Sequence, residues 1–290
     1  MTRIITNFAQ ISANYDAAFV DLWGCMHNGL VAYPDAVRAM QDFRAAGGAV
    51  ILVTNSPKPR SFVEKQLVRF GVPPESYDAI ATSGDSARSA MFRGAVGEKL
   101  WFIGEGTDES FFEPLKIITD PTPISRVPLE QAEGIVCCGP FDAKADPSVM
   151  RPQFLYAIQK GMKLLCANPD IVVDRGDERE WCAGALARLY TEMGGESLYF
   201  GKPHPPIYDL ARRRLAGLGK DPSDSRIIAI GDGIHTDIQG AMGEDIDSLF
   251  ITGGLAAEET ATTDGPDAAK LADYVARARV TPTYAIGYLR

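Results

Sequence analysis

Apolar runs that alternate with amphipathic stretches constrain the fold of this chain more than any other feature of its sequence. The run "YDAAFVDLW" is typical of a buried strand, and so are "AVILVTNS" and "SRIIAIGDG". Between the first two lies "YPDAVRAMQDFRAAG", which has Ala36, Met40 and Phe43 on one helical stripe and Gly47 as its end. Strands that alternate with helices in this way favour a parallel sheet, so we expect an α/β fold.

Polar residues follow four of the expected strands. They are Asp21, Thr54 with Asn55, Lys202, and Asp232 with Asp237. In parallel α/β sheets, ligands bind beyond the carboxyl ends of the strands. Carboxylates are hard oxygen ligands that suit Mg²⁺, and a lysine supplies a positive charge. A carboxylate nucleophile beside Mg²⁺ suits phosphoryl transfer through an aspartyl-phosphate.

Charge and hydropathy exclude two classes of partner. The 290 residues carry a formal net charge of −9, which argues against a nucleic-acid partner. No segment approaches the roughly 18 consecutive apolar residues of a membrane span. The start, "MTRIITNFAQ", has no apolar signal core. We therefore expect a cytoplasmic protein that binds neither nucleic acid nor a membrane.

The cysteines do not form a recognisable framework. They are Cys25, Cys137, Cys138, Cys166 and Cys182. Their odd number and irregular spacing fit neither paired disulfides nor a zinc site, so we expect buried free thiols.

With these residues the sequence resembles the haloacid dehalogenase (HAD) superfamily of hydrolases over nearly its whole length. The four family motifs appear in order: "DLWG" from Asp21, "VTNS" with Thr54 and Asn55, the lysine of "FGKPHPPIY", and "GDGIHTD" from Asp232. Each motif is short, but their order and strand context make the combined signal specific. The resemblance is closest to subclass IIA, the branch of nucleotide, sugar and pyridoxal phosphate phosphatases.

This resemblance implies a Rossmann-like, three-layer α/β/α core with a parallel sheet and an inserted α/β cap domain of the kind found in subclass IIA. We expect residues 1–82 and 182–290 to form the core domain and residues 83–181 to form the cap. The stretch "CANPD" is similar to an "NPD" stretch of such caps, where Asn168 and Asp170 would either contact the substrate or structure the loop. The resemblance also allows a homodimer.

The resemblance implies a role for each motif residue. Asp21 would be the nucleophile, and Lys202 would neutralise charge between Asp21 and the phosphoryl group. The implied metal-site residues are Asp21, Trp23 through its backbone carbonyl, Asp232, and Asp237, which would hold a metal-bound water or Lys202. The implied phosphate-binding residues are Thr54, Asn55 and Lys202. The implied cofactor is Mg²⁺.

Trp23 departs from the D-x-D pattern of family phosphatases. The second acid of that pattern protonates the leaving oxygen and activates water, and such help is typically worth about 10²–10⁴ in rate. An indole N–H does not titrate usefully. Three explanations remain open: His27 substitutes as the acid and base, the substrate has a good leaving group, or efficient turnover has been lost.

The expected function is therefore Mg²⁺-dependent hydrolysis of a small phosphorylated metabolite, such as a sugar phosphate, through an aspartyl-phosphate on Asp21. One alternative is a metal-independent 2-haloacid dehalogenase, because those relatives also carry an aromatic residue in place of the second acid. The two acids of "GDGIHTD" and the cap pattern argue against it. The other alternative is a catalytically weakened protein that binds a phosphometabolite.

Overall fold

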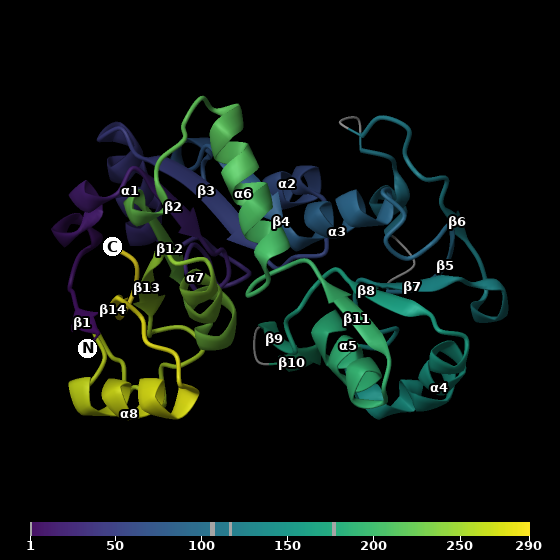
Figure 1. The fold of residues 1–290 in the computed structure, drawn as a ribbon. Helices are drawn as coiled ribbons and strands as arrows, with labels where there is room; N and C mark the ends of the chain where they lie inside the picture. The colour runs from purple at the N-terminus through teal and green to yellow at the C-terminus, as the bar shows by residue number, and fades with distance from the viewer. Residues whose placement is uncertain (1, 105–107, 116–117, 176–177) are drawn as a thin grey trace. The chain divides into compact units, whose positions relative to one another are not determined.

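A computed structural model describes residues 2–104, 108–115, 118–175 and 178–290 of the chain (Figure 1). The chain forms two compact units. The first comprises Met1–Thr54, Glu64–Ala81 and Lys202–Arg290, and the second comprises Asn55–Val63 and Thr82–Gly201.

The first unit is built, within the described residues, on a seven-stranded sheet. Its strands lie in the order β1 (Arg3–Ile4), β14 (Tyr284–Ile286), β13 (Asp247–Ile251), β12 (Ile227–Gly231), β2 (Ala17–Val20), β3 (Ala49–Thr54) and β4 (Ala79–Thr82). The pairs from β1 through β3 are parallel. The register sets Val20 beside Ile230 and Leu52, so β2, β3 and β12 end at the same edge.

Both faces of this sheet are buried, which explains why its central strands are continuously apolar. On one face, Phe19, Ile51 and Ala229 pack against α6 (Pro205–Gly217). Val20 and Leu52 point to the opposite face and are also fully buried. The other helices of this unit are α1 (Pro34–Ala45), most of α2 (Arg60–Phe70), α7 (Gln239–Gly243) and α8 (Ala268–Ala278).

The second unit contains, within the described residues, a five-stranded sheet and a two-stranded one. The larger sheet has the order β11 (Glu196–Tyr199), β8 (Lys163–Cys166), β7 (Gly134–Cys137), β5 (Lys99–Ile103) and β6 (Ser125–Arg126), with every neighbouring pair parallel. An antiparallel pair is formed by β9 (Val172–Arg175) and β10 (Glu178–Trp181). The helices are α3 (Ser83–Met91), α4 (Arg151–Gln159) and α5 (Ala183–Glu192).

Side chains of the larger second sheet alternate between two cores, as the period of two in a strand requires. Ile135 and Cys137 of β7 pack with Phe154 of α4 and Leu186 of α5. Val136, which lies between them in the chain, packs in a separate cluster that includes α3. Helices therefore cover both faces of this sheet as well.

The observed architecture is the α/β fold with parallel sheets that the sequence predicts. The compact units do not coincide with the predicted domain ranges, because α5 and β11 pack in the second unit although residues 182–201 were assigned to the core. The boundary of a functional cap at 83–181 stays a prediction. All five cysteines are buried, and none of them forms a disulfide bond. Among the described residues, no helix combines the length and apolar character that crossing a membrane requires.

Candidate active site

The carboxyl edge of the first sheet gathers acidic side chains from separate parts of the chain. Asp21 follows β2 directly, Asp232 follows β12, and Thr54 is the last residue of β3. These three strands are neighbours in the sheet, in the order β12, β2, β3. The backbone N–H of Asp21 donates to the carbonyl oxygen of Ile230 at 2.8 Å, which extends the ladder by one residue. Parallel pairing thus fixes where these polar groups emerge.

Lys202 connects two of the acids. Its Nζ lies 2.6 Å from Asp21 Oδ1 and 2.7 Å from Asp237 Oδ1, and all three side chains are buried. Burial by itself lowers the pKa of Lys202, but the two carboxylates outweigh that effect and raise the pKa well above its ordinary value. Lys202 is therefore a permanent cation inside this cluster.

Asp237 lies in a short π-helical turn, Ile234–Ile238, and is held by groups of that turn and its N-cap, Gly233. The Gly233 N–H donates to Asp237 Oδ2 at 3.1 Å, and the Thr236 hydroxyl donates to the same oxygen at 3.2 Å. A Cβ atom on Gly231 would lie 2.0 Å from Asp237 Cγ, so only glycine fits there. Burial raises the pKa of Asp237, and Lys202 opposes that change. These contacts fix the carboxylate that Lys202 binds.

Asp232 lies between two glycines. A Cβ atom on either Gly24 or Gly254 would approach Asp232 Oδ2 to 2.1 Å. The Leu255 N–H donates to the same oxygen at 3.1 Å. Burial raises the pKa of Asp232 well above its ordinary value, and the charges of Asp21 and Asp237 raise it further.

The donor set fits a hard divalent cation. Among the described side chains of this cluster, three buried carboxylates face one ammonium, so their ionised forms exceed it by two negative charges, which a divalent cation can offset. Ligand atoms of Asp21, Cys25 and Asp232 all lie within 4.8 Å of one another. Burial raises the pKa of the Cys25 thiol well above its ordinary value, so that group stays protonated and the carboxylate oxygens are the available donors. Oxygen donors of this kind suit Mg²⁺.

Trp23 and His27 belong to an aromatic cluster. The Trp23 and His27 ring centroids are 5.7 Å apart, and the His27 ring meets Phe70 at 4.8 Å. The backbones of Trp23 and His27 form an isolated bridge. A Cβ atom on Gly29 would lie 2.3 Å from the Trp23 indole, which therefore packs directly on that glycine.

His27 is buried and structurally engaged. Its Nδ1 accepts a hydrogen bond from the Gly29 N–H at 3.0 Å, an interaction that a proton on Nδ1 would break. Burial lowers the pKa of His27 to about 4. The ring is therefore neutral at pH 7. A neutral imidazole can accept a proton but cannot protonate a leaving group, so the structure does not favour the general acid role suggested for His27.

The remaining predicted residues lie in two places. Thr54 is buried in the first unit, at the end of β3. Asn55, Asn168 and Asp170 all belong to the second unit, where Asn55 Nδ2 donates to Asp170 Oδ1 at 2.8 Å. The sequence leaves open whether Asn168 and Asp170 contact the substrate or structure their loop, and it does not indicate the hydrogen bond between Asp170 and Asn55.

Sequence reasoning also missed the glycines that make room for the acids. Gly24 has a φ of +75°, a left-handed conformation that favours glycine. Gly254 lies shortly after β13, in the stretch "ITGG". A glycine that follows a strand at the ligand-binding edge was the available signal for a close approach.

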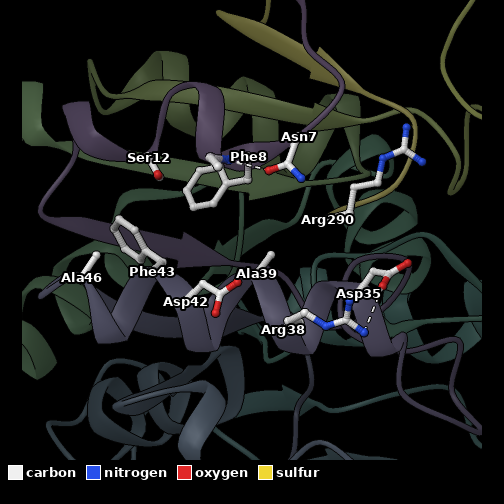
Figure 2. A pocket seen from close by; sticks show the side chains of 11 residues that line it. Asn7, Phe8, Ser12, Asp35, Arg38, Ala39, Asp42, Phe43, Ala46 and Arg290 are labelled. Atoms are coloured by element: carbon white, nitrogen blue, oxygen red, sulfur yellow. Dashed lines mark hydrogen bonds and ion pairs between the residues drawn. The ribbon is translucent and has the colours of Figure 1, made fainter.

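A groove elsewhere in the first unit contains none of the predicted site residues. Figure 2 shows it between the N-terminal segment and α1, with a volume of about 430 Å³. Its lining includes Phe8, Phe43, Arg38 and Arg290. The Arg38–Asp35 ion pair across 3.6 Å is exposed and contributes little. The lining of this groove has no residue in common with the buried acid cluster.

Fold and site together define the class of this protein: a parallel α/β protein with a buried carboxylate–lysine cluster at the carboxyl edge of its sheet. A family model for haloacid dehalogenase-like hydrolases matches residues 18–117, and a second, HAD-hydrolase-like model matches residues 199–278. A haloacid dehalogenase-like hydrolase from Brucella suis 1330 is 36% identical, with 99% of this chain and 100% of that chain covered and a TM-score of 0.84. The chain belongs to the haloacid dehalogenase-like hydrolases.

More distant structures share the fold. A possible sugar phosphatase from Cytophaga hutchinsonii is 16% identical, with coverage of 99% of this chain and 98% of that chain and a TM-score of 0.75. A glycerol phosphate phosphatase from Mycobacterium tuberculosis, in complex with magnesium, is 22% identical, with coverage of 95% and 76% and a TM-score of 0.68. These two likenesses concern the fold alone. No curated protein matches the sequence of this chain.

Proposed function

We propose that this protein is a Mg²⁺-dependent phosphatase that hydrolyses a small phosphorylated metabolite through an aspartyl-phosphate on Asp21. The observation that carries the proposal is the buried cluster of Asp21, Asp232, Asp237 and Lys202. In their ionised forms its three carboxylates exceed its one ammonium by two negative charges, which a divalent cation would offset, and its lysine supports an anion next to Asp21. Phosphoryl transfer needs positioning and charge neutralisation of this kind.

In the proposed reaction, a carboxylate oxygen of Asp21 attacks phosphorus, and the bond between phosphorus and the ester oxygen breaks. Lys202 holds Asp21 and offsets the charge that gathers on the phosphoryl oxygens. Thr54 and Asn55 bind those oxygens. Water then attacks the phosphorus of the aspartyl-phosphate, which releases inorganic phosphate and restores Asp21. Asp21, Asp232 and the Trp23 carbonyl, with Asp237 beside them, would hold Mg²⁺, which would supply further charge neutralisation.

Trp23 determines which esters react well. The leaving oxygen takes its proton from solvent in this proposal, since Trp23 cannot donate one and burial keeps His27 neutral at pH 7. We therefore propose that esters with acidic leaving groups are turned over much faster than alkyl esters.

The relatives support this substrate class. They include a possible sugar phosphatase and a glycerol phosphate phosphatase, and the latter was solved in complex with magnesium. We propose that the substrate here is also a small phosphorylated metabolite, bound with help from a cap. The free thiols fit a reducing compartment, so we keep the cytoplasm as the proposed location and a homodimer as the proposed assembly.

A second candidate is a phosphometabolite-binding protein with little turnover. Trp23 favours it, because binding of an anion needs the lysine and the metal-site acids but not a general acid. A metal-independent dehalogenase is less favoured, because such a reaction leaves the buried, mutually repelling Asp232 and Asp237 without a function.

The test is hydrolysis of a panel of phosphorylated metabolites and one activated aryl phosphate, with Mg²⁺ and with EDTA. Metal-dependent turnover that is abolished in Asp21→Asn supports the phosphatase. Binding of inorganic phosphate without turnover of any ester would instead support the second candidate. Chloride release from 2-haloacids in EDTA would overturn both.

A further inference from the structure

The side-chain amide of Asn55 has a charged partner. Asn55 is 4% exposed, and its Nδ2 donates to Asp170 Oδ1 at 2.8 Å. An ionised carboxylate only accepts hydrogen bonds, so Asp170 requires the NH₂ end of the amide to face it. Because the amide is planar, the N–H that donates to Asp170 also fixes the direction of the second N–H and of Oδ1.

Asp170 is itself held in place by its neighbours. Its N–H donates to Asn168 Oδ1 at 3.0 Å, and its carbonyl oxygen accepts from the Gly184 N–H at 3.1 Å. A Cβ atom on Gly184 would lie 2.5 Å from that carbonyl oxygen and 2.1 Å from the Pro169 oxygen. The loop after β8 is thereby fixed against the first turn of α5.

The opposite end of the amide is confined as well. A Cβ atom on Gly201 would lie 2.5 Å from Asn55 Oδ1 and 2.7 Å from Ser83 Oγ. Gly201 directly precedes Lys202 in the chain, and Asn55 directly follows Thr54. The amide of Asn55 is therefore packed at Oδ1 and hydrogen-bonded at Nδ2, which leaves it one orientation.

We propose that Asp170 is a positioning residue that holds the Asn55 amide ready to donate to a phosphoryl oxygen, rather than a residue that contacts the substrate. This inference rests on the proposed function, because it takes Asn55 as a phosphate ligand. Without Asp170 the amide can rotate by half a turn and present its oxygen, which repels an anionic phosphoryl group.

A double-mutant cycle tests this inference, since residues that act through one another are not additive. The proteins are wild type, Asp170→Ala, Asn55→Ala and the double variant. The readouts are the dissociation constant of inorganic phosphate in Mg²⁺, and kcat and KM for an activated aryl phosphate. Asp170→Ala is expected to weaken phosphate binding roughly tenfold, as loss of a hydrogen bond to a charged group does. In the Asn55→Ala background the same substitution should have no further effect.

Two further variants separate positioning from general stability. Asp170→Asn keeps an acceptor oxygen for Asn55 and should restore most of the phosphate affinity. Asp146→Ala removes an exposed acid of the same unit that accepts from the Ser148 N–H at 2.8 Å, and it should leave phosphate binding unchanged. Thermal unfolding of each variant verifies that it is folded.

Every outcome bears on the inference. Additive effects in the cycle, or no effect of Asp170→Ala, would overturn it. If wild type binds phosphate but hydrolyses no ester, the proposed function fails, while the cycle is still read from the phosphate dissociation constants. If wild type does not bind phosphate at all, both the proposed function and the inference are wrong.

Discussion

His27 illustrates at the scale of one residue how burial determines chemistry. The pKa of His27 falls from an ordinary value of 6.5 to about 4 in the folded protein. Between these two pH values the unfolded state binds a proton at His27 and the folded state does not. Stability from a neutral His27 is complete above pH 6.5 and is lost as the pH falls toward 4. We expect a loss of about 2 kcal/mol in the free energy of unfolding between pH 7.5 and pH 5.

Chemical denaturation at the two pH values measures this loss. In the variant His27→Gln, the free energy of unfolding should fall by about 2 kcal/mol less than in wild type over the same pH range. His235→Gln, which changes an exposed histidine, should behave as wild type does. Equal pH sensitivity of wild type and His27→Gln would show that the ring is not held neutral by burial.

Trp23 gives a second prediction at this scale. Trp23→Asp places a titratable group where family phosphatases carry their second acid, although the lost indole packing on Gly29 lowers stability. We expect kcat for an alkyl phosphate to rise roughly tenfold or more, below the full range of a well-placed acid. For an activated aryl phosphate we expect little change, because its leaving group needs no proton.

The control for that experiment is Trp23→Phe, which keeps an aromatic ring and adds no acid. It should leave the ratio of alkyl to aryl turnover as it is in wild type. An unchanged ratio in Trp23→Asp would mean that the missing acid does not limit the reaction.

Residues at strand ends were more predictable than residues in loops. Asp21 and Asp232 follow continuous apolar runs, and parallel pairing brings such ends to one edge whatever the loops do. The environment of His27 was not predictable, since it depends on Phe70, which is remote in the sequence and reaches the ring only through tertiary packing.

The loop between β2 and α1 supplies a prediction at the scale of elements. Gly24 combines a φ of +75° with a built Cβ position 2.1 Å from Asp232 Oδ2. Gly71, after α2, has a similar φ of +84° but no atom within 4 Å of that position. An alanine at either position would strain the backbone, but only an alanine in place of Gly24 would also clash with a carboxylate.

We expect Gly71→Ala to lose about 1 kcal/mol of stability and to bind Mg²⁺ normally. Gly24→Ala should lose stability and also displace the Asp232 carboxylate, so its Mg²⁺ affinity should fall at least roughly tenfold. Isothermal titration with Mg²⁺ measures the affinity, and denaturation measures the stability. Equal Mg²⁺ affinities in the two variants would contradict this account.

Element types were largely predictable because hydrophobic period is a local signal. The helix expected in "YPDAVRAMQDFRAAG" is α1, Pro34–Ala45, and the strand expected in "AVILVTNS" is β3, Ala49–Thr54. The sheet that each element joins was less predictable. Helix α5 has the same amphipathic pattern wherever it packs, and only the structure shows that Leu186 lies in the core of the second sheet.

The buried acids of the first unit lead to a prediction about how the stability of the whole molecule depends on pH and on a bound cation. Burial and neighbouring acids raise the pKa of Asp232, so the metal-free folded protein binds protons more readily than the unfolded chain does. Stability without a cation therefore rises as the pH falls from alkaline values toward the ordinary aspartate pKa. Protons and Mg²⁺ compete for the same oxygens, so the cation should stabilise more at high pH.

Thermal unfolding in Mg²⁺ and in EDTA measures the effect. At a hundredfold excess over the dissociation constant and pH 8, we expect Mg²⁺ to raise Tm by roughly 5 °C or more. At pH 5.5 the rise should be smaller, and in Asp232→Asn it should nearly vanish. A rise of the same size at both pH values would show that these carboxylates do not bind the cation.

The sheet of the first unit combines strands that are far apart in the sequence, since β1 pairs with β14. This pairing sets Arg3 beside Tyr284 and Ile4 beside Ala285. A nascent chain on the ribosome has all strands of the second sheet by residue 199, but it lacks β12, β13 and β14. The second unit can therefore finish folding first, since domains generally fold as units during synthesis. Asp21 is made before the second unit and Asp232 after it, so a polypeptide that ends between these two residues has Asp21 but not the other acids of the cluster. The cluster can assemble only after β12 and Asp237 have been made.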